Sequence, residues 1–123
     1  MLYVLLCYNN EAEVMAWSPG QEATVMAGLA AIQERLTAQG KLGPSARLQG
    51  TGSAKTLVKT STPFVVDGPY AETKEQFLGF YVLDVADMDE ALGIARELGV
   101  ANPGGAYEVR PVMLYAPGAV AAE

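Results

Sequence analysis

Two apolar segments, residues 2–8 and 77–84, constrain the fold of this chain most strongly. Each has the length of a strand and is too short for an ordinary helix. In each segment both alternating sets of side chains are apolar, so neither face of the strand is suited to water. Such strands need cover on both faces of their sheet. The sequence therefore predicts a sheet with helices on one face and a different cover on the other.

Two amphipathic helices are predicted to cover the first face. One begins at the capping pattern Ser18-Pro19-Gly20-Gln21 and ends at Gly40, and the other begins after Asp87 and ends at Gly99. Their apolar stripes are Val25, Met26, Leu29, Ile32 and Leu36 in the first helix, and Met88, Ala91, Leu92, Ala95 and Leu98 in the second. Each stripe needs a sheet to pack against.

The other strand candidates are residues 46–50, 54–60, 64–66 and 107–115. Pro111 lacks an N–H donor, which predicts that the last strand lies at a sheet edge or carries a bulge. The order of elements predicts an α+β fold, a ferredoxin-like βαββαβ antiparallel sheet with two helices on one face. We expect a single domain over residues 1–116 and a flexible tail over residues 117–123.

The second face of this sheet has no cover within the predicted elements. An apolar face of that size is unusual on a soluble monomer. The simplest cover is a second copy of the chain, with the two sheets packed face to face about a twofold axis. The sequence therefore predicts a homodimer with a pocket in or beside the interface.

The residue inventory excludes several functions. With 14 acidic and 8 basic side chains among 123 residues, direct binding of nucleic acid is not expected. The chain has no histidine, which excludes Ser-His-Asp and Cys-His mechanisms. The single cysteine, Cys7, demands no oxidising compartment and predicts a cytoplasmic location. No apolar run is long enough to span a membrane, and Gly50-Thr51-Gly52 lacks the spacing of a nucleotide fingerprint, so neither membrane nor cofactor is expected.

The densest group of polar side chains is the segment from Asp67 to Glu75, which follows a short apolar run. It reads Asp67-Gly68-Pro69-Tyr70-Ala71-Glu72-Thr73-Lys74-Glu75 and continues as Gln76-Phe77-Leu78-Gly79-Phe80-Tyr81. Together with Glu108-Val109-Arg110-Pro111-Val112 and the opening Met1-Leu2-Tyr3-Val4-Leu5-Leu6, it resembles the DGPF-domain branch of the YCII-related family. The resemblance implies a ferredoxin-like α+β fold, a dimer with the character of an α+β barrel, and a cleft near the motif. It also implies that some relatives are linked to extracytoplasmic-function sigma factors and that a few act on small aromatic compounds.

Asp67 is the candidate catalytic residue. A carboxylate in a partly dry cleft can act as a general base, and the alternative is that Asp67 caps the backbone of its own turn. Glu72, Lys74 and Glu75 are expected to orient a polar ligand, or else to form a solvated ion pair. Tyr70 contributes a phenol to the same segment. The three carboxylates match no calcium loop, so no metal site is expected.

Three further candidates lie on predicted strands. Arg110 is expected to pair with Glu72 or Glu75, or to bind an anion. Tyr8 and Tyr81, with Tyr107, are expected to line a pocket, although aromatic residues on strands more often belong to a core or an interface. Cys7 has no cationic neighbour in sequence and is expected to be a small buried apolar residue.

These observations predict a cytoplasmic dimer that binds a small organic molecule in a cleft formed by the Asp67–Glu75 segment and Arg110. If the chain is an enzyme, acid–base chemistry by Asp67, with Arg110 or Lys74 stabilising negative charge, is the mechanism that its residues allow. The alternative is a noncatalytic regulatory or interaction protein, associated with a sigma factor, whose motif maintains the fold and the dimer.

Overall fold

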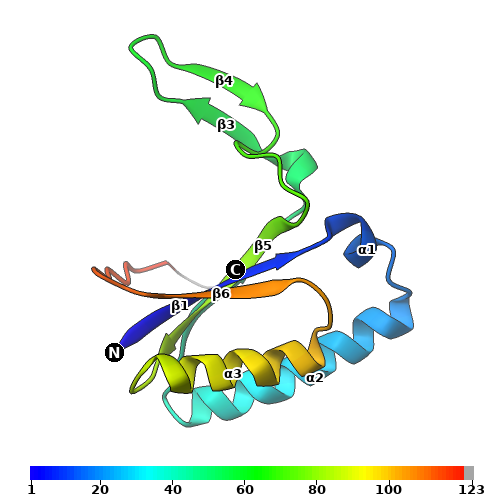
Figure 1. The fold of residues 1–123 in the computed structure, drawn as a ribbon, viewed down its shortest axis with the longest axis vertical. Coiled ribbons are helices and arrows are strands. Elements are labelled where there is room, and N and C mark those ends of the chain that lie inside the picture. Colours follow the sequence, from blue (N-terminus) through cyan, green and yellow to red (C-terminus); the bar gives the residue numbers. More distant parts are fainter. Residues whose placement is uncertain (121–123) are drawn as a thin grey trace.

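The structure, a computed structural model, describes residues 1–120 and has the element order predicted for an α+β fold (Figure 1). The strands are β1 (Leu2–Asn9), β2 (Leu42–Arg47), β3 (Lys55–Val58), β4 (Phe64–Asp67), β5 (Gln76–Asp84) and β6 (Ala106–Pro111). The helices are α1 (Glu11–Met15), α2 (Pro19–Ala38) and α3 (Met88–Ala101), and Thr51–Ser53 form one turn of 3₁₀ helix. The tail predicted for 117–123 is described to residue 120, where it contains no helix or strand, and 121–123 lie outside the described residues.

Four strands form one antiparallel sheet in the order β2-β5-β1-β6. The two central strands are the two segments whose side chains are apolar on both faces, as their patterns require. Helices α2 and α3 lie together on one face of this sheet (Figure 1). With β3 and β4 set aside, the chain follows the predicted βαββαβ path of a ferredoxin-like sheet.

The predicted helix starts are confirmed at both caps. The Ser18 Oγ accepts a hydrogen bond of 3.1 Å from the Gln21 backbone N–H, and Asp87 Oδ1 accepts one of 2.9 Å from Glu90 N–H. Helix α2 ends before Gly40, which has φ +70°. The prediction that Gly99 ends the second helix is wrong, because Gly99 remains inside α3 and the chain leaves the helix only after Ala101.

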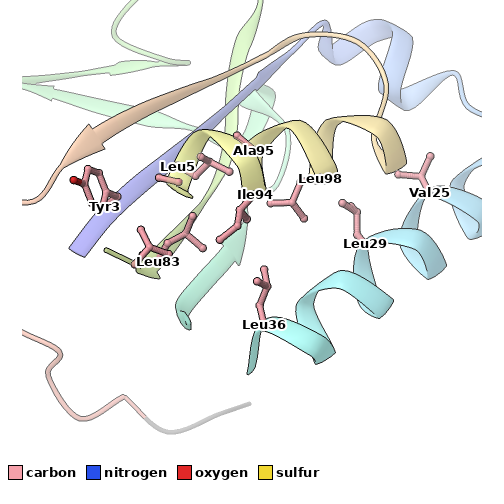
Figure 2. Packing of buried hydrophobic residues seen from close by; sticks show 11 residues of the cluster. Tyr3, Leu5, Val25, Leu29, Leu36, Leu83, Ile94, Ala95 and Leu98 are labelled. Atoms are coloured by element: carbon pink, nitrogen blue, oxygen red, sulfur yellow. The ribbon is translucent and has the colours of Figure 1, made fainter. Parts of the chain in front are cut away.

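The core lies between this sheet and the two long helices (Figure 2). Its fully buried side chains come from both layers: Leu5 and Leu83 from the sheet, Leu36 and Leu98 from the helices. Tyr3 packs at the end of the same cluster, where Figure 2 shows it beside the sheet strands. Met26, although part of the predicted stripe, is exposed.

Two boundaries differ from the predictions, and one short helix was not predicted. The strand predicted at 46–50 is β2 at Leu42–Arg47, an edge strand whose register with β5 is irregular between Leu42 and Ser45. The last strand ends at Pro111 rather than at residue 115, and it does lie at a sheet edge. Helix α1 was not expected, because five residues are too few to show a stripe.

Strands β3 and β4 form a separate two-stranded sheet that projects from the rest of the molecule (Figure 1). We call residues 55–67 the arm. Lys55 pairs with Asp67, Leu57 with Val65, and Val58 with Phe64 across its strands. Within residues 1–120 no helix is long and apolar enough to cross a lipid bilayer.

Candidate functional site

A cavity of about 280 Å³ lies between the sheet and helix α2. We call it the inner cavity. Its apolar wall includes Trp17, Val25 and Leu29, and its polar lining consists of Cys7, Tyr8, Asn9, Gln33, Ser45, Arg47, Tyr81, Asn102 and Tyr107. The lining groups come from β1, β2, β5, β6, α2 and the segments that flank α2 and α3, so the ferredoxin-like arrangement itself brings them together. The volume is close to the lower end of the range for small-molecule pockets.

Two phenols of this cavity are each held by an amide. Gln33 Nε2 donates a hydrogen bond of 3.1 Å to the Tyr81 hydroxyl, and Asn102 Nδ2 donates one of 3.2 Å to the Tyr107 hydroxyl. Because each phenol oxygen accepts in these bonds, its own O–H can donate to another group. Burial raises the pKa of Tyr107 to about 12 and also raises the pKa of Tyr81. Both phenols are therefore neutral hydrogen-bond donors near pH 7.

The cysteine in this cavity is not activated. Burial raises the pKa of Cys7 to about 12, so its thiol stays protonated near neutral pH. Asn9 is buried, and its side chain already bonds to the backbone, accepting from Asn10 N–H at 2.8 Å and donating to Pro103 O at 3.5 Å. Cys7 therefore offers a small apolar surface, and Asn9 holds the backbone of the cavity wall.

Arg47 is the charged residue on the wall of the inner cavity within the described chain. Its guanidinium reaches from β2 toward α2, where Nη2 lies 3.2 Å from Glu22 Oε1 and Nη1 lies 3.5 Å from Met26 Sδ. The side chain is about half exposed, so this ion pair is weak and can exchange partners. The cavity therefore has apolar walls, two neutral phenol donors and, at one side, the guanidinium of Arg47.

A second cavity, of about 620 Å³, lies at the base of the arm. We call it the arm-base cavity. Pro69, Ala71, Thr73 and Gln76 of the predicted motif line it, opposite Thr51 and its neighbours. The Glu11 carboxylate fixes this wall, because it accepts hydrogen bonds of 2.6 Å from both the backbone N–H and the hydroxyl of Thr51. These two bonds lower the pKa of Glu11.

The three tyrosines expected to line a pocket do line a cavity. Tyr81 and Tyr107 belong to the inner cavity, and Tyr8 borders both cavities, with its ring centroid 5.7 Å from that of Phe77. Asp67 lies at the end of β4, where its side chain is 87% exposed and its Oδ1 is 2.6 Å from Lys55 Nζ. Within one chain, the expected general base is thus a surface ion pair of the arm, away from the walls of both cavities.

The charged motif residues lie beside the arm-base cavity rather than on its wall. Glu72 and Lys74 are exposed, Glu75 is half-buried, and Tyr70 is 83% exposed. Their neighbours in sequence, Ala71 and Thr73, supply the lining instead. The structure of one chain therefore does not bring these four predicted ligand-binding side chains into a common pocket.

The preferred pairing of Arg110 with Glu72 or Glu75 is wrong for the single chain. Arg110 Nε lies 3.9 Å from Glu108 Oε2, and the Arg110 side chain is 67% exposed. The register of β6 with β1 explains this result, because Arg110 pairs with Val4 and Glu108 with Leu6, two positions apart on the same face. Glu108 is therefore the carboxylate that lies beside Arg110 on this strand.

Sequence reasoning missed Gln33 and Arg47. A signal for Gln33 was present, because it follows Leu29 by four residues and thus shares the buried side of the helix. No such signal marked Arg47, whose position depends on the pairing of β2 with β5. Among residues 1–120 no group of three or more histidine, cysteine, aspartate or glutamate side chains is arranged to hold a metal ion.

Comparisons with known proteins add a family and a fold. The YCII-related domain model matches residues 1–116. An uncharacterised protein of Rhizobium meliloti (strain 1021) is 53% identical over 120 residues, which cover 96% of this chain and 97% of that protein. A solved structure, the 5-chloro-2-hydroxyhydroquinone dehydrochlorinase TftG of Burkholderia phenoliruptrix AC1100 in complex with 2,5-dihydroxybenzoquinone, matches with a TM-score of 0.52 and 17% identity over 91% of this chain and 93% of that chain. At that identity the likeness shows a shared α+β fold and nothing of the chemistry.

Proposed function

The chain belongs to the YCII-related domain family, and from this premise we propose that it binds a small organic molecule in the inner cavity. The observation that carries the proposal is the pair of neutral phenols, each oriented by an amide, in a largely apolar cavity with one cation. Apolar walls with a few convergent polar groups are the usual design of small-molecule sites. Membership of the DGPF branch stays a prediction.

The ligand that fits this lining is a flat ring with oxygen substituents. Trp17 and Leu29 offer apolar contact to a ring, while Tyr81 and Tyr107 can donate hydrogen bonds to hydroxyl or oxo groups. Arg47 can balance the negative charge of an acidic substituent by leaving Glu22. The structure of TftG with a dihydroxybenzoquinone supports this choice of ligand class for a protein of similar fold.

We extend the proposal to acid–base chemistry on such a ligand. Neutral phenols and a guanidinium can stabilise negative charge that develops on a ligand oxygen. Attack by a nucleophile is disfavoured, because the Cys7 thiol remains protonated near pH 7. The general-base role of Asp67 stays a prediction, as do the ligand contacts of Tyr70, Glu72, Lys74, Glu75 and Arg110, which lie outside both cavity walls of the single chain.

Trp17 provides a direct test of binding. It is the only tryptophan of the chain and it lines the inner cavity, so a bound quinone should quench its fluorescence. We expect 2,5-dihydroxybenzoquinone to quench the wild-type protein saturably. Tyr81→Phe and Tyr107→Phe should each weaken the affinity roughly threefold to tenfold, the effect of one hydrogen bond.

The matched control is Tyr70→Phe, which removes a phenol that is 83% exposed and lies outside the walls of both cavities. This variant should bind as the wild type does. The proposal is wrong if quenching does not saturate, or if all three phenylalanine variants have the affinity of the wild type. A pH titration of binding from 6 to 8 should be flat, because both cavity phenols stay protonated in that range.

A noncatalytic regulatory or interaction role is the alternative. An association with an extracytoplasmic-function sigma factor stays a prediction that the comparisons do not support. The same fluorescence experiment separates the two functions, because an interaction protein has no need to hold a small ligand between its sheet and helix α2. The cytoplasmic location also stays a prediction.

A further inference from the structure

Four residues of the inner cavity lie in one row across the main sheet. In strand order they are Arg47 of β2, Gly79 of β5, Cys7 of β1 and Tyr107 of β6, and each is the direct partner of the next. Directly paired residues of neighbouring antiparallel strands point to the same face of a sheet. All four line the inner cavity, so this face is the one that α2 covers. We call these four residues the cross-strand row.

The middle of the cross-strand row leaves room for a ligand. Gly79 has no side chain, and a Cβ at this position would lie 2.4 Å from the carbonyl oxygen of Ala46, so the close pairing of β5 with β2 requires glycine here. Cys7 adds only a small thiol, which stays protonated near neutral pH because burial raises its pKa to about 12. Val25 and Leu29 of α2 bound the space from the opposite side. A flat apolar ring suits a space with these walls.

The two ends of the row carry different hydrogen-bonding groups. Three strand spacings of about 4.8 Å separate the Cα atoms of Arg47 and Tyr107 by roughly 14 Å, which leaves room for one substituted ring between the two side chains. The Tyr107 hydroxyl accepts a hydrogen bond from Asn102 Nδ2, so its own proton is free to donate to a ligand. A ligand that lies along the row therefore meets a cation at one end and a neutral donor at the other.

A carboxylate of the chain itself pairs with Arg47. Glu22 Oε1 of α2 lies 3.2 Å from Arg47 Nη2, and both side chains are about half exposed. Arg47 Nη1 lies 3.5 Å from Met26 Sδ, which is a weak acceptor. Glu22 is not part of the cavity wall, whereas Arg47 is. Because an ion pair this exposed contributes little to stability, the guanidinium can exchange Glu22 for the carboxylate of a ligand.

The rest of the lining disfavours other charged ligands. Among the described residues no carboxylate lines the inner cavity, so an ammonium group would have no anionic partner there. A phosphate monoester carries close to two negative charges and would meet a single guanidinium. A carboxylate matches the planar fork of the guanidinium with its two oxygens. Since the net charge of −6 repels anions at long range, preference for an anion has to come from this local contact.

We propose that the inner cavity selects ring carboxylates, whose carboxylate binds Arg47 in place of Glu22 while an oxygen on the far side of the ring accepts a hydrogen bond from Tyr107. This inference rests on the proposed function, that the inner cavity holds a ring with oxygen substituents. It adds the ligand class, an aromatic acid with a second oxygen para to the carboxylate. Arg47 is then the specificity-determining residue, and Glu22 competes with the ligand for it.

Calorimetric titration of the full-length protein at pH 7 with 4-hydroxybenzoate and its neutral counterpart 4-hydroxybenzamide tests the inference. The wild type should bind 4-hydroxybenzoate roughly tenfold to a hundredfold more tightly, the effect of hydrogen bonding between charged groups. Arg47→Gln should bind the two compounds with affinities within roughly twofold of each other. Glu22→Gln should bind 4-hydroxybenzoate roughly twofold to fivefold more tightly than the wild type, because no carboxylate then competes for the guanidinium.

The matched controls make the same charge changes away from the cavity. Arg96→Gln on α3 and Glu34→Gln on α2 replace exposed side chains outside the cavity wall, and both variants should bind 4-hydroxybenzoate as the wild type does. Arg47→Lys keeps the charge without the planar fork and should show an intermediate preference. Far-ultraviolet circular dichroism checks the fold, and Arg47→Lys with Glu22→Gln carries the test if Arg47→Gln does not fold.

The outcomes separate this inference from the proposed function. Saturable binding of 2,5-dihydroxybenzoquinone without a preference for 4-hydroxybenzoate over 4-hydroxybenzamide would overturn the inference and leave the proposed function intact. Failure of all three compounds to bind would overturn both. Weaker binding of 4-hydroxybenzoate by Glu22→Gln would show that Glu22 positions Arg47 rather than competes for it, which contradicts the exchange of carboxylates.

Discussion

Among single residues, Gly105 places the strictest demand on the backbone, in the turn that leads from α3 into β6. It has φ +71°, and a Cβ built on it would lie 2.0 Å from the carbonyl oxygen of Tyr8. Its neighbour Gly104 also has positive φ and lies against the Asn9 side chain. Only glycine lets the chain turn from α3 into β6 this close to β1.

Gly105→Ala is therefore expected to lower the free energy of unfolding by about 3 kcal/mol, the sum of backbone strain and a clash with backbone. Gly40→Ala serves as the control, because Gly40 has a similar φ of +70° but open space around its Cβ position. It should cost about 1 kcal/mol, the strain alone. Urea unfolding measures both values, and equal losses would contradict the steric explanation.

Among the elements, α1 is connected to the wall of the arm-base cavity by the Glu11 carboxylate. Glu11 accepts two hydrogen bonds from Thr51 and so ties the short helix to the wall of the arm-base cavity. Because these bonds lower the pKa of Glu11 below its ordinary value of 4.5, its ionised form is favoured in the folded state. The resulting stability is present above about pH 4.5 and is lost as the pH falls through the lowered pKa.

Glu11→Gln should consequently destabilise the protein at pH 7, and the difference from the wild type should shrink as the pH falls below 4.5. Urea unfolding between pH 3 and pH 7 measures this difference. Glu13→Gln is the control on the same helix, where the side chain is exposed. A difference between Glu11→Gln and wild type that stays constant with pH would show that the carboxylate charge is not the cause.

The elements also show which parts of the fold are readable from sequence. The central strands and both long helices are predictable, because burial imposes period, length and caps on their own residues. Strand β2 is not, since Leu42–Arg47 contains Gly43 and Pro44 and is held by its pairing with β5. The same distinction holds at the candidate site, where Tyr8 and Tyr81 come from strong strands and Arg47 comes from the weak one.

At the scale of the whole molecule, stability is concentrated in one part. Leu5, Leu36, Leu83 and Leu98 are fully buried between the main sheet and the helices, and the arm contributes no residue to this core. The arm instead depends on its own cross-strand pairs and on whatever covers its apolar faces. Local opening should therefore require little free energy in the arm and nearly the full unfolding free energy in the centre of the sheet.

Hydrogen exchange at two protein concentrations measures the free energy of local opening in the arm and in the centre of the sheet. The amides of β1 and β5 should exchange slowly at any concentration, because their opening requires loss of the core. Those of β3 and β4 should be weakly protected in dilute solution and should gain protection as the concentration rises, because a second copy that binds only the closed arm stabilises it by mass action. The Leu57→Glu and Val65→Glu double variant should remove this dependence on concentration. Strong protection of the arm in a sample shown to be monomeric would mean that the hairpin is stable without cover by a second copy.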